Sequence, residues 1–301
     1  MDNSNYKAGF VAIIGKPNAG KSTLMNLLLG EQLAITNPKA QTTRHGLHGI
    51  VSEKHFQIIY TDTPGIIKPA YPLQTAMMKA VTTACVSADV IIWLVNVKEL
   101  KDAASLLNEN PVYDKPTLLV LNKMDLVSPA QLDQVMADLL HHNSNLHLLP
   151  ISATKRINIA QLLEKIIAWL PVHPPYYPAH TLTDRPERFF VQEIIREKIL
   201  GQYEQEIPYS VEVAIDSFKE MENLIKIQAI IYVERQTQKG ILIGAKGSGL
   251  NQLGINARIA LEQFFQKKIF LGLHVKLAQN WRKNKLLLEK FGYPSIAEKK
   301  V

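Results

Sequence analysis

The stretch Gly15-Lys16-Pro17-Asn18-Ala19-Gly20-Lys21-Ser22 decides the fold of the first part of the chain. It matches the pattern G-x-x-x-x-G-K-S, and it lies between the apolar run Phe10–Ile14 and Thr23–Leu29, which predicts a helix ending at Gly30. A strand, this loop and a helix are the context that the pattern requires. Inward-facing N–H groups and the helix N-terminus then bind phosphate oxygens. The sequence predicts a nucleoside triphosphate site, in which Lys21 contacts the β- and γ-phosphates and Ser22 coordinates Mg²⁺.

Composition indicates an ordinary globular chain of about two domains, since 47% of its 301 residues are hydrophobic and 20% are charged. No apolar run approaches the roughly 20 residues that span a bilayer, and the polar N-terminus does not match a signal peptide. Cys85 is the single cysteine, which excludes an intramolecular disulfide and a cysteine metal site. We expect a reducing compartment, the cytoplasm.

The net charge of +7 is unevenly distributed. Residues 1–170 contain 15 Lys and Arg against 13 Asp and Glu, whereas residues 235–301 contain 13 basic residues against 3 acidic ones. A basic region at one end favours a polyanionic partner such as nucleic acid or an anionic membrane. Composition alone leaves open the alternative of a solvated charged face.

Apolar runs of strand length alternate with helical patterns up to residue 170. The predicted strands cover 10–14, 46–51, 55–60, 90–95, 117–121 and 146–151. The predicted helices cover 70–87, a helix starting at Ser128 with proline at its first position, and 158–170, while 31–45 is predicted to be a loop. This alternation predicts an α/β domain with a doubly wound, mostly parallel sheet over residues 1–172.

A proline-rich stretch at 173–184 predicts a stiff linker, followed by an α+β domain over residues 185–301. In this domain the pattern predicts a helix at 188–203, strands at 209–216 and 224–233, a helix before a G-x-x-G loop, a helix to about residue 266 and a strand at 270–277. Residues 281–291 predict a basic amphipathic helix.

Three further motifs follow predicted strands in the first domain. Asp62-Thr63-Pro64-Gly65 precedes Ile66, and an aspartate at this place can hold Mg²⁺ through water while the Gly65 N–H contacts the γ-phosphate. In Asn122-Lys123-Met124-Asp125, the Asn amide and the Lys stem can contact a guanine ring, and the Asp carboxylate accepts from its N1–H and amino group. Ser152-Ala153-Thr154 can direct a backbone N–H at the guanine carbonyl.

Together these motifs resemble those of the translation-factor-related GTPases. The segment Gln41-Thr42-Thr43-Arg44, the proline third in the Asp62–Gly65 motif, and Ile243-Gly244-Ala245-Lys246-Gly247 after the linker extend the resemblance to bacterial GTPases that carry a C-terminal KH domain. The resemblance implies that Thr43 joins Ser22 and Asp62 at Mg²⁺, with Thr42 as the alternative. We expect Lys21, Thr43, Gly65 and Asn18 to act in GTP hydrolysis to GDP.

The G-x-x-G loop predicts a type II KH domain, which clamps about four nucleotides of single-stranded nucleic acid. The helix after the loop begins Ser248-Gly249-Leu250-Asn251-Gln252 and carries no lysine there. Phosphate contacts are therefore expected from other basic residues, namely Arg258, Lys267, Lys268, Arg282, Lys283 and Lys285.

The resemblance also implies partners. It implies a monomer that binds the 3′ end of small-subunit (16S) ribosomal RNA, assists assembly of the 30S subunit and couples assembly to growth. Peripheral contact with the inner membrane is likewise implied by the resemblance, and in the sequence only the basic helix expected at 281–291 favours it.

Alternatives remain open from the residues. Ile66 stands where many GTPases carry a water-orienting glutamine, so the chain could be an RNA chaperone that binds nucleotide and barely hydrolyses it. A tRNA-modifying GTPase would need a further domain and a reactive cysteine. The Asn18 side chain could hold K⁺ against the developing charge, or could merely fit a left-handed turn. The histidines at 45, 48, 55, 141, 142 and 147 show no metal-ligand spacing.

Overall fold

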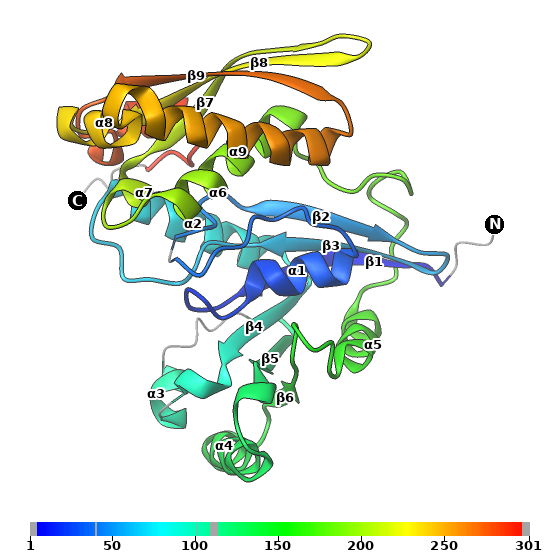
Figure 1. Ribbon diagram of the computed structural model, residues 1–301. Coiled ribbons are helices and arrows are strands. Elements are labelled where there is room, and N and C mark those ends of the chain that lie inside the picture. Colours follow the sequence, from blue (N-terminus) through cyan, green and yellow to red (C-terminus); the bar gives the residue numbers. More distant parts are fainter. Residues whose placement is uncertain (1–4, 40, 101, 109–113, 297–301) are drawn as a thin grey trace. The chain divides into compact units, whose positions relative to one another are not determined.

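A computed structural model describes residues 5–39, 41–100, 102–108 and 114–296. The chain divides into two compact units (Figure 1). The first unit is formed by Met1–Ala34, Thr43–Lys68 and Met78–Asp184, and the second by Ile35–Thr42, Pro69–Met77 and Arg185–Val301.

The first unit is built on a six-stranded sheet with the strand order β2-β3-β1-β4-β5-β6. Only β2 runs antiparallel to its neighbour, β3, and the other neighbouring pairs are parallel. The predicted doubly wound, mostly parallel sheet is therefore confirmed. The strands are β1 Lys7–Ile14, β2 Leu47–Ser52, β3 Phe56–Asp62, β4 Val90–Asn96, β5 Thr117–Asn122 and β6 His147–Pro150.

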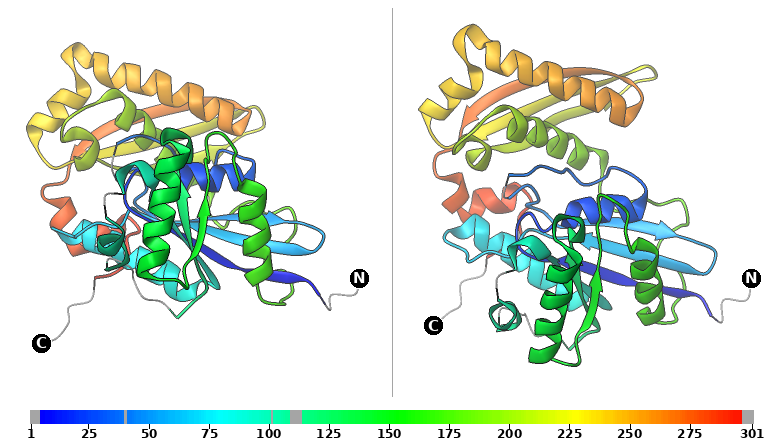
Figure 2. Two further views of the ribbon diagram at one scale, coloured as in Figure 1. Left: turned by 90° about the horizontal axis from the view of Figure 1, so that it is seen from below. Right: turned by 60° about the horizontal axis from the view of Figure 1, so that its bottom comes forward.

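Helices cover both faces of this sheet (Figures 1 and 2). On one face, Ile14, Trp93 and Leu121 of the sheet pack with Val81 of α2 and Leu139 of α4 in one buried cluster. The α4 helix starts as predicted, because the Ser128 side chain accepts from the backbone N–H of its third residue. The helices are α1 Lys21–Leu29, α2 Pro72–Ser87, α3 Ala103–Asn108, α4 Pro129–His142 and α5 Ile159–Trp169, with short 3-10 turns η1 Val97–Glu99 and η2 Met124–Leu126.

The proline-rich segment 173–184 is fixed to the first unit rather than free. The buried Gln57 side chain accepts from the N–H groups of Tyr176 and Tyr177, at 2.7 and 3.0 Å. Its amide donates to the Tyr177 carbonyl at 2.8 Å. Further along, the Ile50 N–H of β2 donates to the Leu182 carbonyl at 2.8 Å. The segment therefore lies along the sheet, with its backbone bonded to it at both ends.

The second unit contains a three-stranded sheet with the order β7-β8-β9, in which β7 is antiparallel and β9 parallel to β8. Helices α6 and α9 lie on one face of this sheet (Figure 2). Its elements are α6 Glu187–Gln202, α7 Ile207–Ser210, β7 Glu212–Glu220, β8 Leu224–Val233, α8 Gln236–Ile243, η3 Ala245–Gly247, α9 Ser248–Phe265 and β9 Lys268–Leu277. The order of helices and strands matches the predicted type II KH fold.

The helix predicted at 281–291 is wrong. The chain instead forms a 3-10 turn η4, Trp281–Lys283, and a separate helix α10, Lys285–Lys290. Trp281 is fully buried, and its indole N–H donates to the Ser210 carbonyl at 2.8 Å. The Asn284 side chain accepts from the Leu287 N–H at 3.2 Å and starts the second helix there.

Two other differences are smaller. Strand β7 begins at Glu212 rather than residue 209, because the N–H groups of Tyr209 and Ser210 bond the Glu206 carbonyl within the short α7. Helix α3 was not predicted. Among the described residues, none of the helices combines the length and the apolar character needed to cross a membrane.

Candidate nucleotide site and nucleic-acid interface

The loop between β1 and α1 holds a buried cation. Lys21, only 6% exposed, donates from its ammonium to the carbonyls of Gly15 and Lys16 at 3.2 and 3.0 Å. Burial lowers the pKa of Lys21 to about 8, and the Asp62 carboxylate opposes that shift. A buried ammonium gains strongly from an anion, because the low local dielectric strengthens their attraction. The loop therefore suits a polyphosphate.

Three oxygen-bearing side chains converge beside this lysine. The Asp62 Oδ2 accepts from the hydroxyls of Ser22 and Thr43 at 2.7 and 3.1 Å, and the two hydroxyl oxygens lie 3.0 Å apart. The three residues come from α1, from the segment before β2 and from the end of β3. The structure thus brings together the three residues that the sequence suggested as metal ligands.

The Asp62 carboxylate is completely buried, and this desolvation raises its pKa. Its Oδ1 atom is buried without a hydrogen-bond partner among the described residues. An unpaired buried carboxylate oxygen is costly unless a cation satisfies it. Hard oxygen ligands are those that Mg²⁺ prefers. The donor set therefore fits Mg²⁺, which Ser22, Thr43 and Asp62 would hold.

The segment after Asp62 lies directly on the phosphate loop. The Thr63 hydroxyl donates to the Ile13 carbonyl at 2.8 Å, and the Ile66 N–H donates to the Gly15 carbonyl at 2.9 Å. A Cβ atom on Gly65 would lie 2.8 Å from the backbone nitrogen of Pro17. Only glycine therefore allows this approach, which brings the Gly65 backbone to the edge of the loop.

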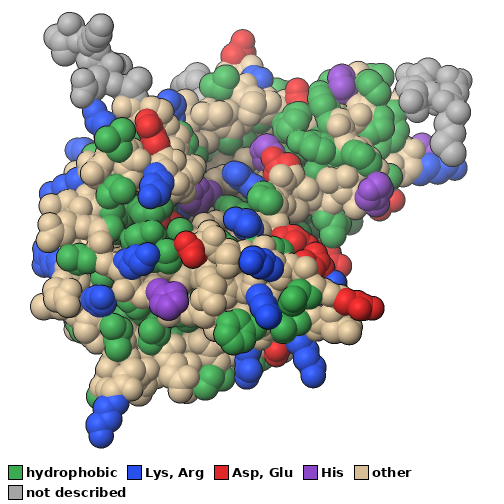
Figure 3. Space-filling view, turned by 90° about the horizontal axis from the view of Figure 1, so that it is seen from above, with side chains coloured by type: hydrophobic (Ala, Val, Ile, Leu, Met, Phe, Trp, Pro, Cys, Tyr) green, Lys and Arg blue, Asp and Glu red, His purple; other side chains and the backbone are tan. Residues whose placement is uncertain are grey.

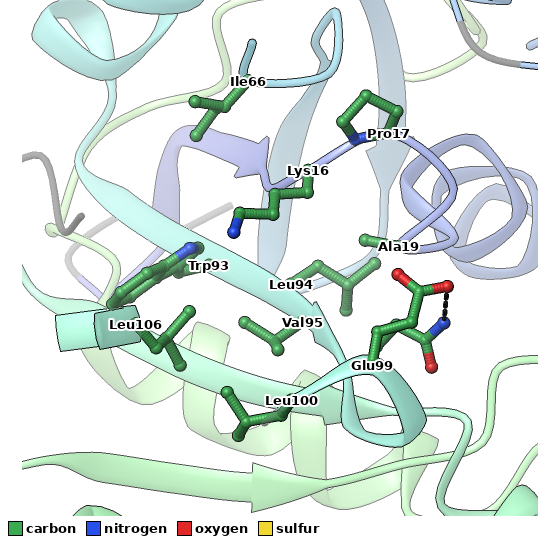
Figure 4. A pocket seen from close by; sticks show the side chains of 11 residues that line it. Lys16, Pro17, Ala19, Ile66, Trp93, Leu94, Val95, Glu99, Leu100 and Leu106 are labelled. Atoms are coloured by element: carbon green, nitrogen blue, oxygen red, sulfur yellow. Dashed lines mark hydrogen bonds between the residues drawn. The ribbon is translucent and has the colours of Figure 1, made fainter. Parts of the chain in front are cut away.

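Ile66 borders a small apolar pocket next to the loop (Figure 4). The pocket has a volume of about 80 Å³, and it is lined by Lys16, Pro17, Ala19, Ile66, Trp93, Leu94, Val95, Asn96, Glu99, Leu100 and Leu106. Its carboxylate, Glu99, accepts from the Asn96 amide at 2.7 Å. Ile66 thus stands in an apolar environment and has no group that could orient water. Arg44 is 1% exposed and is buried in the fold.

Asn122 braces two loops of the first unit. Its amide donates to the Ala19 carbonyl at 2.8 Å, and its oxygen accepts from the Ala153 N–H at 3.1 Å. The residue is 2% exposed. The amide carries two N–H groups, so this supporting role leaves the contact of Asn122 with guanine as a prediction. The bond from the Ala153 N–H occupies one of the backbone N–H groups of the Ser152–Thr154 motif.

The remaining residues of the base motif differ in exposure, and Met124 packs against the core. The Lys123 ammonium donates to the Asn18 carbonyl at 2.8 Å, so the lysine stem spans from the base motif to the phosphate loop. Asp125 is exposed in η2. The side chain of Asn18 is exposed, and its backbone has the left-handed φ of 61°. Both interpretations of Asn18, a turn residue and a cation ligand, are compatible with this geometry.

The G-x-x-G loop of the second unit is exposed at its tip and braced at its base. Gly244 and Gly247 have φ of 74° and 84°, and Ala245 and Lys246 between them are exposed. The Tyr203 hydroxyl donates to the Leu242 carbonyl at 2.7 Å, and the Gln202 amide donates to the Gly249 carbonyl at 2.8 Å. Sequence reasoning missed this bracing, which comes from the end of α6.

The structure does not collect the predicted basic residues at this loop. Arg258 is exposed midway along α9, a helix of 18 residues, which is about 27 Å long. Lys267 and Lys268 follow the far end of that helix, and Lys267 pairs with Glu220 at 2.5 Å. These residues therefore do not cluster around Gly244–Gly247, and their contacts with phosphates stay a prediction. Of the two isoleucines in α8 just before the loop, Ile243 packs against the core of the second unit and Ile241 is 54% exposed.

A second group of contacts was also missed, because it joins residues far apart in the chain. Within the second unit, the Lys39 ammonium donates to the carbonyls of Leu200 and Tyr203 at 2.7 and 2.6 Å. The buried Arg196 guanidinium donates to the Thr42 carbonyl and pairs with Glu193. The segment just before Thr43 is therefore anchored by α6.

Both parts of the chain are similar to known protein families. A family model described as a 50S ribosome-binding GTPase matches residues 10–123, and a KH domain model matches residues 206–282. The GTPase Era of Lacticaseibacillus paracasei is 43% identical over 293 residues, which cover 96% of this chain and 98% of that protein. A chloroplastic GTPase ERA-like protein of Oryza sativa is 41% identical, over 96% of this chain and 70% of its own length.

Two solved structures match over nearly the whole chain. An Era variant of Aquifex aeolicus bound to GDP and AlF4⁻ has a TM-score of 0.90 at 34% identity, covering 95% of this chain and 99% of its own. An Era complex with MgGDPNP and nucleotides 1506–1542 of 16S ribosomal RNA has a TM-score of 0.90 at 35% identity, covering 96% and 99%. The chain belongs to the Era family of GTPases.

Proposed function

We propose that the chain hydrolyses GTP with Mg²⁺, binds the 3′ end of small-subunit (16S) ribosomal RNA through its KH domain, and thereby assists assembly of the 30S subunit and couples it to growth. The observation that carries the nucleotide part is the buried carboxylate of Asp62, whose Oδ1 atom is unpartnered beside the hydroxyls of Ser22 and Thr43. The Era complex with MgGDPNP and a 16S RNA fragment supports the RNA part.

In the proposed hydrolysis, different residues bind the phosphates and the guanine base of GTP. The loop N–H groups and Lys21 bind the β- and γ-phosphates, and the Gly65 N–H contacts the γ-phosphate. Bound Mg²⁺ neutralises charge that develops on the phosphate oxygens. The Asp125 carboxylate accepts two hydrogen bonds from guanine, a pair that adenine does not offer. Attack by water on the γ-phosphate gives GDP and phosphate.

We also propose that K⁺ assists hydrolysis. Ile66 faces an apolar pocket and cannot orient the attacking water. The Asn18 side chain is exposed at the phosphate loop, where its oxygen could hold a monovalent cation against the β- and γ-phosphates. A positive charge there would offset the charge that builds during transfer.

The KH part of the proposal rests on the exposed tip of the G-x-x-G loop. A loop of this type lets the sugar–phosphate backbone approach closely and clamps about four nucleotides. Lys246 is exposed within the tip and supplies a positive charge. We expect a monomer that acts in the cytoplasm.

Two alternatives are less well supported by the residues. Cys85 is buried in the core of the first unit, which disfavours a reactive cysteine of a tRNA-modifying GTPase. Contact with the inner membrane comes only from the family resemblance, and the single basic helix that favoured it is divided between η4 and α10. We therefore restrict the proposal to RNA.

A single-turnover hydrolysis assay tests the proposal. GTP should be hydrolysed in the presence of Mg²⁺ and not after chelation. An RNA with the sequence of nucleotides 1506–1542 of 16S ribosomal RNA should bind the protein. RNA binding combined with negligible hydrolysis, with and without that RNA and with K⁺ present, would favour the alternative of an RNA chaperone, which the apolar surroundings of Ile66 motivate.

A further inference from the structure

The sheet of the second unit has one face covered by helices and one open face. The residues Ile225, Ile227 and Ile231 of β8 belong to the buried cluster formed with α6 and α9. Because side chains alternate along a strand, Lys226 and Gln228 point to the opposite face. In β9, Ile269 and Val275 are buried in the same cluster, so the side chains of even-numbered residues 268 to 276 also lie on that face. Figure 3 looks down on it.

Four lysines are exposed on this face, namely Lys219, Lys226, Lys268 and Lys276. None of the four makes an ion pair or side-chain hydrogen bond within the described part of the chain. Of the three acidic residues of β7, Glu212 is buried against Tyr293, Asp216 lies at a β-bulge and Glu220 pairs with Lys267. The face is therefore basic, without a carboxylate for each lysine.

An exposed aromatic ring lies among these lysines. The register aligns Lys219 of β7, Lys226 of β8 and Phe270 of β9 in one row across the sheet. Phe270 is 54% exposed and stacks on no other ring among the described residues. Two lysines directly opposite each other destabilise a sheet. A bound polyanion would offset this cost, and the ring offers a surface on which a base can stack.

In the next row on this face, Gln228 of β8 lies opposite Gly272 of β9, which has no side chain. A Cβ atom on Gly272 would lie 2.1 Å from the Gln228 Oε1, so the Gln228 side chain lies across the glycine. The lysines at residues 268 and 276 stand about 26 Å apart along β9, at about 3.3 Å per residue. A spread of that length suits an extended strand of phosphates rather than one phosphate group.

We propose that this open sheet face, formed by Lys219, Lys226, Lys268, Lys276, Phe270 and His274, is a second contact for single-stranded RNA. The lysines contact phosphates, and an unpaired base stacks on Phe270. This inference rests on the proposed RNA-binding function. It adds a surface on the face of the sheet opposite to the helices that carry the G-x-x-G loop.

Two pairs of variants test the lysines and the ring separately. The double variant Lys226→Gln/Lys276→Gln is matched by Lys54→Gln/Lys165→Gln, which removes two exposed lysines from the first unit. Phe270→Leu keeps an apolar side chain, and Phe270→Tyr keeps the ring. Affinity is measured for two mixed-sequence RNAs, one unstructured and about 20 nucleotides long, the other of about four nucleotides, which the G-x-x-G loop can fill alone.

For the longer RNA, the lysine double variant should lose about tenfold in affinity near 0.15 M salt. Its slope of log K against log salt should fall by about 1.4, or about 0.7 for each lost phosphate contact. Phe270→Leu should lose about fivefold and Phe270→Tyr should not. Binding of the short RNA, GTP hydrolysis without RNA, and the Lys54→Gln/Lys165→Gln variant should all match wild type.

Wild-type affinity of the open-face variants for the longer RNA would overturn this inference alone. Loss with the lysine variant but not with Phe270→Leu would contradict a single-stranded occupant. Binding to vesicles of phosphatidylglycerol is measured as well. If the open-face variants lost affinity for these vesicles but not for the RNAs, the face would be assigned to a membrane and the inference would be contradicted. Failure of the wild-type protein to bind either RNA would overturn the proposed function, and the inference with it.

Discussion

The nucleotide site and the G-x-x-G loop are built in opposite ways. At the nucleotide site, Lys21 and Asp62 are buried and held by several hydrogen bonds. At the G-x-x-G loop, Ala245 and Lys246 are exposed and only the base of the loop is bonded, through Tyr203 and Gln202. A buried polar site depends on each of its groups, whereas an exposed loop distributes binding over backbone and shape. Removing a single polar group should therefore cost more at the first site.

The largest effect is expected at Asp62. Asp62→Asn keeps the size of the side chain but removes the charge that would hold Mg²⁺, so hydrolysis should fall about 100-fold or more. Burial raises the pKa of Asp62, so its contribution to stability is present at low pH and is lost as the pH rises through the folded pKa. At pH 8 without Mg²⁺, the variant should therefore melt no lower than wild type. Asp133→Asn, at an exposed position of α4, is the control. A lower melting temperature for Asp62→Asn would contradict this account of the site.

Guanine selection should show a smaller effect. Asp125→Asn replaces a paired acceptor with a mixed donor and acceptor. Losing a charge-assisted bond costs about 2–3 kcal/mol, so GTP should bind tens of fold more weakly and xanthosine triphosphate should be preferred. Equilibrium binding of both nucleotides measures this. An unchanged affinity for GTP would remove Asp125 from the site.

Potassium dependence should be smaller again. At equal ionic strength, KCl should support hydrolysis about tenfold faster than NaCl, which is about 1.4 kcal/mol of barrier. Asn18→Ala should abolish the difference, because the cation would lose a side-chain ligand. Equal rates for the wild-type protein in both salts would sink the potassium proposal, leaving a group supplied by a partner as the better account.

The smallest effect is expected at the base of the G-x-x-G loop. Tyr203→Phe removes the hydrogen bond to the Leu242 carbonyl, worth about 1 kcal/mol. RNA affinity should fall about fivefold or less, and GTP affinity should not change. Tyr176→Phe, exposed in the segment 173–184 of the first unit, is the control. A loss as large as that expected at Asp62 would mean that the loop is not more tolerant than the nucleotide site.

The sequence revealed contiguous motifs better than contacts between distant residues. The phosphate loop could be predicted because its residues act within one turn after a strand, and β1 and α1 supply that context. The brace formed by Asn122 could not, since it joins Ala19 and Ala153 from separate loops. The same reason hid the contacts that Lys39 makes with the Leu200 carbonyl and that Arg196 makes with the Thr42 carbonyl.

Tertiary packing also overrode local pattern. The spacing of Trp281 and Leu288 fits one helical face, yet the burial of Trp281 against Ser210 and the capping by Asn284 divide the segment. The open sheet face was hidden for a related reason. Its lysines come from three strands, and only the register shows that Lys219, Lys226 and Phe270 share a row.

The central claim, that GTP and RNA bind at separate sites of one chain, is tested most directly at Gly247. Gly247→Asp puts a negative charge at the exposed loop, where a Cβ atom on residue 247 would meet no other atom within 4 Å. Gly292→Asp is a matched control, since Gly292 has the same φ of 84° and equally open surroundings. Both affinities are measured on each protein. RNA binding should collapse in Gly247→Asp alone, while GTP affinity stays within about twofold because the two units have separate cores. Retained RNA affinity in the folded Gly247→Asp protein, or a parallel loss of GTP binding, would contradict the claim.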